Sequence, residues 1–590
     1  MRLLPFATVC ALACSPAYPQ SVVSSGADGL GISGTAYGFA TSTDGRYVSY
    51  CFRPAPADPL GNDPRSDAFL KDRTLGTLVK VSLRENGSAF TNAQCQRTAV
   101  SDDGRYVAFG IRDFDLPSLA EYNVKEQVYR RDVPASTTVL ASRTAAGAPF
   151  QWDVALADMT PDGRLVLMDV DYPVTGRRAG DEYGLVLRDQ ATGTNLQVAT
   201  NPPANGTFDI GKGSVSRDGR FVTYSSNWPQ DPAYPGEYDR QAYVFDANGP
   251  GTRLVSRGAS GTPSDTDVVV GRLARNGRYL LFASDSQALG IPFNTGGRIF
   301  RADLETGTLD LVTRKNDGTV TSIYLYEFGW YDADLTEDGN LVSFMSSTPL
   351  GNSSLEQVSG FLGLLMYIRD MSTGFAALGA VNSQGSLPPR PEHRLAGNGS
   401  SVVFSAGAPG FASGLPGNPT GQLLFADATP APVDLNVVLA DRGEEPGPFA
   451  GQRYQRLEMI VTNQSAAPAR LIRVLLGTPA VHRLVTSDQP VCGTRISDGS
   501  PPIFCNLPSL APGATFSVHL TVDITDEVPA TLQAGVSQLD ADPDPADDTD
   551  ALEVGAQSGG GGGGGGAIDF LALSMLGAAA LVRSRCRWRT

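Results

Sequence analysis

Histidine is scarce in this chain of 590 residues, where only His393, His482 and His519 occur. No two of them have the spacing of a zinc motif, so we expect no zinc centre. A G-x-S-x-G segment is also missing, which disfavours a serine hydrolase of the α/β type. These absences predict a protein without catalytic residues, cofactor or metal that is not an enzyme. A hydrolase or lyase site built from two carboxylates stays open as an alternative.

The chain also lacks clusters of lysine and arginine between its ends. Its 46 Lys and Arg face 62 Asp and Glu, which gives a net charge of −16. An acidic surface repels phosphate backbones, so no nucleic acid is expected among its partners.

Residues 1–20, MRLLPFATVCALACSPAYPQ, have one positive charge, an apolar run and then small residues. This order is typical of a secretory signal peptide, with cleavage by signal peptidase after Ala17 or shortly beyond it. A lipoprotein site at Cys14 is a weaker alternative, because Ala11 stands where leucine is usual.

The other end of the chain combines a glycine run at 558–566, an apolar segment at 567–582 and the basic residues RSRCRWR. The apolar segment is short for a membrane-spanning helix, and the arginines would stay on the cytoplasmic side. This layout resembles the GlyGly-CTERM sorting signal of Gram-negative bacteria. The resemblance implies transient anchoring in the inner membrane, cleavage by a rhomboid-type protease, and delivery to the cell surface, the outer membrane or the medium. A retained membrane anchor is the alternative.

Four cysteines remain between these terminal segments, namely Cys51, Cys95, Cys492 and Cys505. An even number in an exported protein predicts two disulfides. Buried thiols are the alternative for Cys51 and Cys95.

A ten-residue phrase such as SDDGRYVAFG (101–110) recurs seven times at intervals of 56 to 62 residues. Its turn residues are Asp44, Asp103, Asp162, Asp218, Asn276, Asp338 and Asn398, each followed by glycine. Asp-Gly and Asn-Gly between alternating apolar runs predict two-residue hairpins with positive φ at both turn positions. Asp or Asn at the same turn in every repeat indicates a structural role, not a metal or catalytic site.

A second hairpin follows in each repeat, for example LVLRDQATGTNLQVA (185–199), so each repeat contains four strands. Four-stranded units in tandem predict a β-propeller. The seventh unit lacks its last strand, and the segment VVSSGADG at residue 22 has no preceding strands. We therefore expect an all-β, seven-bladed propeller that is closed by the N-terminal strand. The repeat resembles the TolB-type propeller repeat over residues 22–430.

In this arrangement the short turns lie on one face of the propeller and the long loops lie on the other, where binding sites concentrate. The ligand-binding candidates on these loops are Trp152, Tyr172, Trp228, Tyr234, Tyr238, Tyr326, Trp330 and Tyr331. The alternative is that these rings only cover the backbone of their own loops.

The 59-residue period stops near residue 431, and short alternating strands predict a β-sandwich beyond it. The stretch around Cys492 and Cys505 resembles an Ig-like repeat module of bacterial surface proteins, which implies a spacer. The acidic segment 540–550 offers ligands for calcium, with a solvated hairpin as the alternative.

The predicted organisation is a signal peptide (1–20), a propeller (21–430), an Ig-like sandwich (431–555) and a sorting tail with a short transmembrane helix (556–590). We expect an exported binding or scaffolding protein that recognises an envelope or extracellular protein, a peptide or a polysaccharide. A surface carbohydrate-active or peptidase-like enzyme is the alternative.

Overall fold

The computed structural model describes most of the chain from Ser21 to Val554. The described part leaves out residues 1–20, 25–33, 55–64, 115–125, 171–183, 201–209, 237–238, 291–296, 316–317, 319, 322–332, 347–349, 351–364, 373, 375, 379–391, 407–421, 428–432, 466–468, 478–482, 488–491, 495–502, 526–529, 538–545 and 555–590. The predicted signal peptide and sorting tail therefore lie outside it. A search of the described residues for a helix that could cross a membrane finds none.

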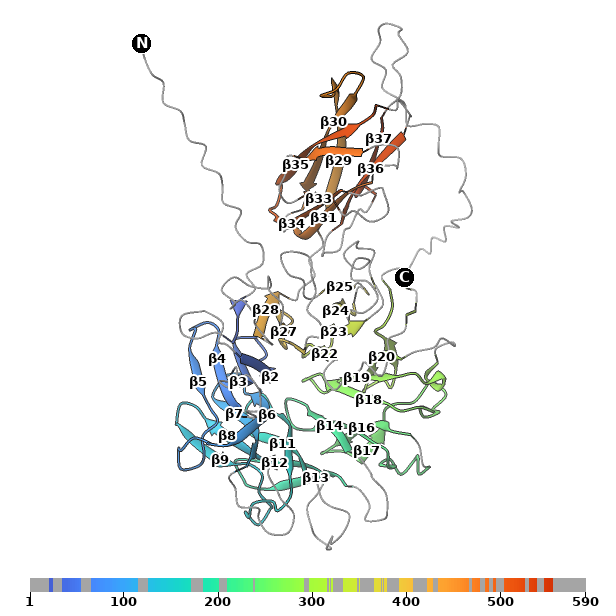
Figure 1. The fold of residues 1–590 in the computed structure, drawn as a ribbon. Helices are drawn as coiled ribbons and strands as arrows, with labels where there is room; N and C mark the ends of the chain where they lie inside the picture. The colour runs from blue at the N-terminus through green and yellow to red at the C-terminus, as the bar shows by residue number, and fades with distance from the viewer. Residues whose placement is uncertain are drawn as a thin grey trace, which may run out of the picture.

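Between Ser21 and Asp427 the described residues form seven four-stranded antiparallel sheets, called sheets 1 to 7 in chain order (Figure 1). Sheets 1 to 3 consist of β2 (Gly34–Thr41), β3 (Tyr47–Pro54), β4 (Asp67–Asp72) and β5 (Leu78–Lys80); β6 (Ala93–Val100), β7 (Tyr106–Asp113), β8 (Glu126–Asp132) and β9 (Thr137–Leu140); and β10 (Val154–Met159), β11 (Leu165–Val170), β12 (Gly184–Asp189) and β13 (Asn195–Ala199). Sheets 4 to 6 consist of β14 (Ile210–Val215), β15 (Phe221–Ser226), β16 (Gln241–Asp246) and β17 (Gly251–Leu254); β18 (Val269–Leu273), β19 (Tyr279–Ser284), β20 (Arg298–Asp303) and β21 (Leu309–Leu311); and β22 (Ala333–Leu335), β23 (Leu341–Ser346), β24 (Leu365–Asp370) and β25 (Ala376–Leu378). A short 3-10 helix, η1 (Gln287–Leu289), follows β19.

The seventh sheet takes one strand from the start of the chain. It contains β26 (His393–Leu395), β27 (Ser401–Ala406), β28 (Gln422–Asp427) and β1 (Ser21–Val22). Ser21 lies opposite Phe425, and the Val23 N–H donates to the Leu423 carbonyl at 2.8 Å. The predicted pairing of the N-terminal strand with the seventh repeat is thus confirmed.

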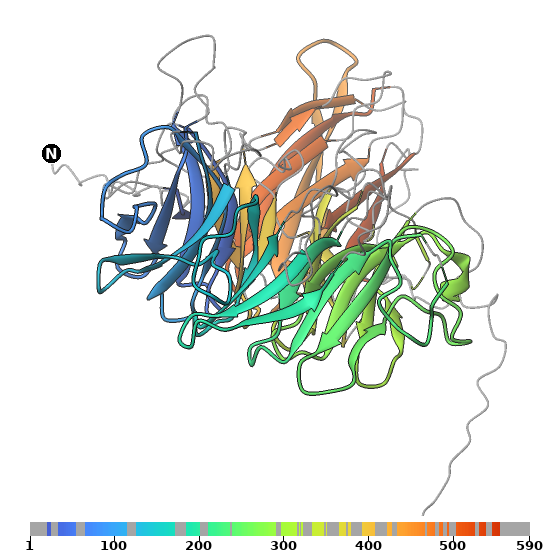
Figure 2. The same ribbon diagram turned by 90° about the horizontal axis from the view of Figure 1, so that it is seen from below.

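The first strands of the seven sheets form a closed ring. Each first strand contacts the first strand of the next sheet, and β26 contacts β2. Figure 2 shows the sheets from below, where their colours run from blue through green in chain order. Backbone hydrogen bonds between the Asp-Gly turns of successive sheets reinforce the ring, and the Asn398 N–H donates to the Thr43 carbonyl at 2.8 Å where sheet 7 meets sheet 1. The described residues therefore have a propeller fold.

The inner strands of these sheets are nearly continuous apolar runs because both of their faces are covered. In β19, five of the six residues YLLFAS are buried. Aromatic rings on the second and third strands face each other in five sheets, with ring centroids 5.3 to 6.0 Å apart. These pairs are Tyr50 and Phe69, Phe109 and Tyr129, Tyr224 and Tyr243, Phe282 and Phe300, and Phe344 and Tyr367. Each stacked pair contributes about 0.5–1.5 kcal/mol beyond the burial of its area.

The Asp-Gly turns are longer than the two-residue hairpins that the sequence predicts. In sheet 1 the Ser42 N–H donates to the Tyr47 carbonyl at 2.9 Å, so residues 43–46 form the turn. Gly45 has a φ of +72°, whereas Asp44 has a negative φ. The Asp44 carboxylate accepts hydrogen bonds from Ser42 Oγ (2.6 Å) and the Arg46 N–H (2.9 Å), which stabilises a turn without positive φ at the aspartate. The prediction of positive φ at both positions is wrong for this reason.

The same bond, from the N–H two residues on, reaches the side chain of every other turn residue of the repeat. These acceptors are Asp103, Asp162, Asp218, Asn276, Asp338 and Asn398. The repeated acidic residue therefore has a structural role.

The arginine after each Asp-Gly turn clamps the end of the third strand in sheets 1 to 5. Its guanidinium lies 2.6 to 2.8 Å from an aspartate in the second turn of the same sheet. The pairs are Arg46 with Asp72, Arg105 with Asp132, Arg164 with Asp189, Arg220 with Asp246, and Arg278 with Asp303. Asn340 and Ser400 replace this arginine in sheets 6 and 7.

Residues from Leu435 onward form two further sheets, drawn in orange to red in Figure 1. One contains β29 (Leu435–Pro446), β30 (Arg453–Asn463), β35 (Thr515–Asp523) and β32 (Arg483–Ser487), and the other contains β33 (Cys492–Thr494), β34 (Ile503–Leu510), β31 (Ala469–Gly477), β36 (Ala530–Ser537) and β37 (Thr549–Val554). Buried residues from both sheets share one hydrophobic core. Along β30, Leu457, Met459 and Val461 are buried while the residues between them are less so, as expected for a sheet with one covered face.

Candidate functional site

The central channel of the ring is a cavity of about 100 Å³. Every sheet lines it with its first strand or with the turn that follows. A cavity of this size holds several water molecules or a small polar group. A peptide segment or an oligosaccharide would extend out of the channel at one end.

One position of the repeat, two residues before the Ser, Thr or Ala that begins each turn, lines this channel. Sheets 1, 2 and 4 have small residues there, namely Ala40, Ala99 and Ser214. Sheets 3, 5, 6 and 7 have the charged residues Asp158, Arg272, Asp334 and Arg394. The channel is therefore charged on one part of its wall and lined by small side chains on the rest.

Asp158 is the buried centre of this charged group. Its carboxylate lies 2.8 Å from Arg275 Nη1 and accepts a hydrogen bond from the Val215 N–H at 3.0 Å. Burial alone would raise its pKa, but the charges of Arg275 and Arg272 and these hydrogen bonds lower the pKa to about 2. Asp158 is thus ionised at neutral pH and is no general acid.

Arg272 lies between two carboxylates. Its guanidinium is 3.3 Å from Asp334 Oδ1 and 3.9 Å from Asp158 Oδ1. Burial lowers the pKa of Arg272, but Asp334 and Asp158 together raise it above the ordinary value. Asp334 also accepts a hydrogen bond from the Leu395 N–H at 3.0 Å. The cluster therefore ties sheets 3, 5, 6 and 7 together across the channel.

Arg217 closes the channel at the end where the Asp-Gly turns lie. It extends from the turn of sheet 4 to three other turns. Its guanidinium donates to Asp102 Oδ2 at 2.8 Å, to Thr43 Oγ1 at 2.9 Å and to both carboxylate oxygens of Glu337. These contacts raise the pKa of Arg217 further above its ordinary value, Glu337 having the largest effect. The opposite end of the channel faces the side of the propeller on which the second strands end and the third strands begin.

Glu126 lies on this side of sheet 2, at the start of β8. It is buried, with Arg112 Nη2 3.3 Å from its Oε2 atom, and its N–H donates to Asp153 Oδ1 at 2.9 Å. Burial raises the pKa of Glu126 to about 7, Arg112 opposes the shift, and Asp153 adds to it. A carboxyl group that titrates near neutral pH suits proton transfer.

Of the eight aromatic candidates, the structure describes Trp152, Trp228 and Tyr234. Trp152 precedes β10 and packs, half-buried, against the core between sheets 2 and 3. Trp228 follows β15, and its N–H donates to Ser226 Oγ at 3.0 Å. The Tyr234 hydroxyl accepts a hydrogen bond from Arg257 at 3.0 Å. Trp152 and Tyr234 thus also cover neighbouring structure, and ligand contact stays a prediction for all three.

The other five candidates lie outside the described residues. They are Tyr172, Tyr238, Tyr326, Trp330 and Tyr331.

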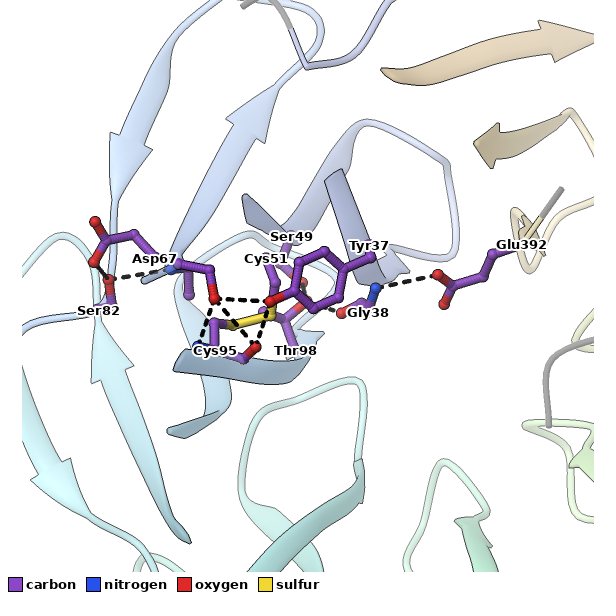
Figure 3. The surroundings of a disulfide bond; sticks show 11 residues. Tyr37, Gly38, Ser49, Cys51, Asp67, Ser82, Cys95, Thr98 and Glu392 are labelled. Atoms are coloured by element: carbon purple, nitrogen blue, oxygen red, sulfur yellow. Dashed lines mark hydrogen bonds between the residues drawn. A yellow bond between two sulfur atoms is a disulfide. The ribbon is translucent and has the colours of Figure 1, made fainter. Parts of the chain in front are cut away.

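The predicted disulfide between Cys51 and Cys95 is present (Figure 3). It joins β3 of sheet 1 to β6 of sheet 2. Both cysteines are fully buried and lie within their strands. Tyr37 Oη donates to the Cys95 carbonyl at 2.8 Å (Figure 3). It also lies 2.7 Å from Ser66 Oγ. The bond therefore fastens the first two sheets of the ring together.

Cys505 also takes part in a disulfide, and Cys492 lies opposite it in the register of β33 and β34. For the proposed calcium segment 540–550, residues 540–545 lie outside the described part. Among the described residues, no group of three His, Cys, Asp or Glu side chains is arranged to hold a metal ion.

Sequence reasoning missed the charged channel, Arg217 and Glu126. A usable signal existed for the channel, because aligning the seven repeats places Asp158, Arg272, Asp334 and Arg394 in one column. A repeat position that is charged in some repeats and Ala or Ser in the others indicates a polar environment that those charged side chains share. Nothing in the repeat identifies Glu126, whose burial depends on how sheets 2 and 3 pack.

No family model matches the chain, and no curated protein matches it either. Solved structures similar to it include an oligogalacturonate lyase from Vibrio parahaemolyticus (12% identity, TM-score 0.38, 68% of this chain and 91% of the other). A puromycin-hydrolyzing peptidase from Mycobacterium tuberculosis has 13% identity and a TM-score of 0.39, over 72% of this chain and 61% of the other. A TolB candidate from Agrobacterium tumefaciens has 15% identity and a TM-score of 0.27, over 47% and 80%.

These neighbours correct one expectation from the sequence. A lyase and a peptidase are among them, so the expectation that the chain is not an enzyme is withdrawn. At these identities and TM-scores the neighbours assign no activity to this chain.

Proposed function

We propose that this chain is a seven-bladed, TolB-like β-propeller that binds a ligand at the long-loop end of its central channel. Each of the seven sheets serves as one blade. The observation that carries the proposal is the closure of the opposite end by Arg217, which bonds to Asp102, Thr43 and Glu337. Trp152 and Trp228 belong to connections on the long-loop side of the propeller and would supply aromatic surface for a sugar or a peptide. The ligand class is an envelope or extracellular protein, a peptide or a polysaccharide.

A binding experiment with matched variants tests this proposal. The purified protein is screened on glycan and peptide arrays, and each hit is titrated against W152A, W228A and L75S. Leu75 is a control because its side chain is 68% exposed in a second-hairpin turn, on the closed face. Loss of at least tenfold in affinity in a tryptophan variant, with L75S unchanged, supports the proposal, since anchoring aromatics carry about 2 kcal/mol or more. Hits that respond to L75S and not to the tryptophan variants would refute it.

A hydrolase or lyase is the second candidate function, and Glu126 is the specific observation in its favour. Its pKa of about 7 allows it to donate and accept a proton at neutral pH, and Asp153 and Arg112 lie beside it. If it is the general acid or base, E126Q abolishes turnover of any substrate found, and the pH profile of the wild type bends near pH 7. A substrate that E126Q still turns over at the wild-type rate would exclude this role.

We further propose that the protein is exported and that the two sheets beyond Leu435 form an Ig-like spacer. Removal of residues 1–20 and cleavage near the glycines at 558–566 would release it at the cell surface of a Gram-negative bacterium. Intact mass and cell fractionation test this directly. A full-length cytosolic product would refute it.

A further inference from the structure

A crevice of about 410 Å³ lies between sheets 5 and 6, away from the central channel. Its charged lining residues are Arg301, Asp310, Arg314, Lys315 and Arg369. Four of these five are cationic, although acidic residues outnumber basic ones in the whole chain by 62 to 46. Such a local excess of positive charge runs against the overall field of the protein.

Two of the cations hold the walls of the crevice in place. Arg301 pairs with Asp310 at 2.6 Å and donates to the Gly339 carbonyl at 2.7 Å. Arg369 is buried, and its guanidinium donates to the carbonyls of Gly374 and Arg314. Burial and the nearby charge of Arg314 lower the pKa of Arg369 to about 10. The positive charges thus repel one another in the empty crevice.

The other two cations, Arg314 and Lys315, begin the hairpin that leads into sheet 6. Arg314 is exposed and Lys315 is half-buried. Neither side chain has an ion pair or a hydrogen bond with any residue that the structure describes. They are therefore available to an incoming ligand.

The equivalent crevice between sheets 2 and 3 provides an internal control. Arg130 there donates to the Gly163 carbonyl as Arg301 does to Gly339, and Arg188 donates to the Arg143 carbonyl as Arg369 does to Arg314. Two differences matter. Arg143, which corresponds to Arg314, pairs with Glu85 at 3.2 Å, and Thr144 stands in place of Lys315. Of these two crevices, the one between sheets 5 and 6 has the same frame with unpaired cations among its described residues.

We propose that this crevice binds a small dianionic oxyanion, such as a phosphate or sulfate group. Charge-assisted hydrogen bonds from Arg314 and Lys315 would hold it, since guanidinium and ammonium groups match such oxygens. A long polyanion fits less well, because the chain as a whole carries a net charge of −16. This inference is independent of the ligand proposed for the channel.

Calorimetric titration of the full chain with inorganic phosphate, glycerol phosphate and acetate, at low ionic strength, tests the site. We expect saturable binding of one phosphate per chain and at least tenfold weaker binding of acetate, because a dianion gains more from several cations. Tighter binding of glycerol phosphate would identify the natural ligand as an ester, and tighter binding of inorganic phosphate would identify the free ion.

The decisive variant is K315T, which copies the residue of the control crevice. We expect it to weaken phosphate binding about tenfold, the range for loss of a charged hydrogen bond. K80T is the matched control, since it makes the same change on β5 of sheet 1, and it should bind phosphate as the wild type does. R314Q provides a second variant should K315T fold poorly. Absence of phosphate binding, or equal affinities in K315T, R314Q and K80T, would overturn the proposal.

Discussion

The central channel and the crevice between sheets 5 and 6 both have many charged side chains, but they differ in how these charges are paired. In the channel, Asp158 and Asp334 face Arg272 and Arg275, so each of these four charges has a partner. Among the described residues that line the crevice, four cations share a single carboxylate, Asp310. The comparison teaches that a charged cavity need not be a ligand site. The ion pairs of the channel hold the sheets together, whereas the unpaired cations of the crevice can bind an anion.

We expect the largest effect when one partner of an ion pair inside the channel is removed. D158N leaves Arg275 and Arg272 buried with too little negative charge, and we expect it to lower the free energy of unfolding by about 3–5 kcal/mol. Denaturant unfolding measures the loss. D218N is the matched control and should stay within about 0.5 kcal/mol, because asparagine already serves that turn position at Asn276 and Asn398. Equal losses in the two variants would contradict the structural role of the channel charges.

Glu126 is a buried acid with one cationic partner, Arg112. The charge of Arg112 does not offset the effect of burial on the pKa of Glu126, so the stability of the protein should depend on pH. Its pKa is about 7 in the folded protein and near 4.5 when unfolded, so the folded state holds the proton more tightly. This stabilising contribution is complete below about pH 4.5 and is lost as the pH rises through 7. E126Q should therefore gain about 1–3 kcal/mol relative to wild type between pH 5 and pH 8. Parallel stability curves for the two proteins would argue against the shift.

Arg217 lies at the edge of the channel, and its side chain is 43% exposed. R217Q should cost about 1 kcal/mol, since it loses charged contacts with Asp102 and Glu337 that water partly screens. Urea unfolding at low and high salt measures this loss, which should shrink at high salt. A loss as large as that of D158N, or one insensitive to salt, would mean that Arg217 acts as a core residue.

The smallest expected effects concern the arginine clamps of sheets 1 to 5. R164Q should lower the melting temperature only slightly, because it removes the contacts with Asp189 at 2.6 Å, which water screens. Conversely, N340R should raise stability by up to about 0.5 kcal/mol, because it restores a clamp toward Asp370 in sheet 6. Thermal melting measures both. A destabilised N340R would show that sheet 6 has no room for the clamp.

Much of the propeller was predictable from the repeat. The Asp-Gly phrase fixes where each first hairpin turns, and the missing strand of the seventh repeat correctly predicts β1. The turn geometry was not predictable from the dipeptide alone, because the hydrogen bonds of Asp44 with Ser42 and Arg46 decide it.

The candidate site was less predictable than the fold. Cys51 and Cys95 could be paired because they stand near a junction of two repeats. Arg217, by contrast, bonds to residues 115, 120 and 174 positions away, and no local pattern encodes such distances. Glu126 is unusual only through its burial, which depends on packing between two sheets.

The pairing of Ser21 with Phe425 has a consequence for how the molecule is made. The ribosome makes β1 first and β28 about 400 residues later. The seventh sheet is therefore completed only after the other sheets have been made. During that interval β1 has no partner strand, and once β28 has been made its outer edge stays unpaired until β1 adds to it. An unpaired edge is open to a neighbouring chain. Losing the few residues around Val22 would make that vulnerability permanent and turn a closed molecule into one prone to self-association.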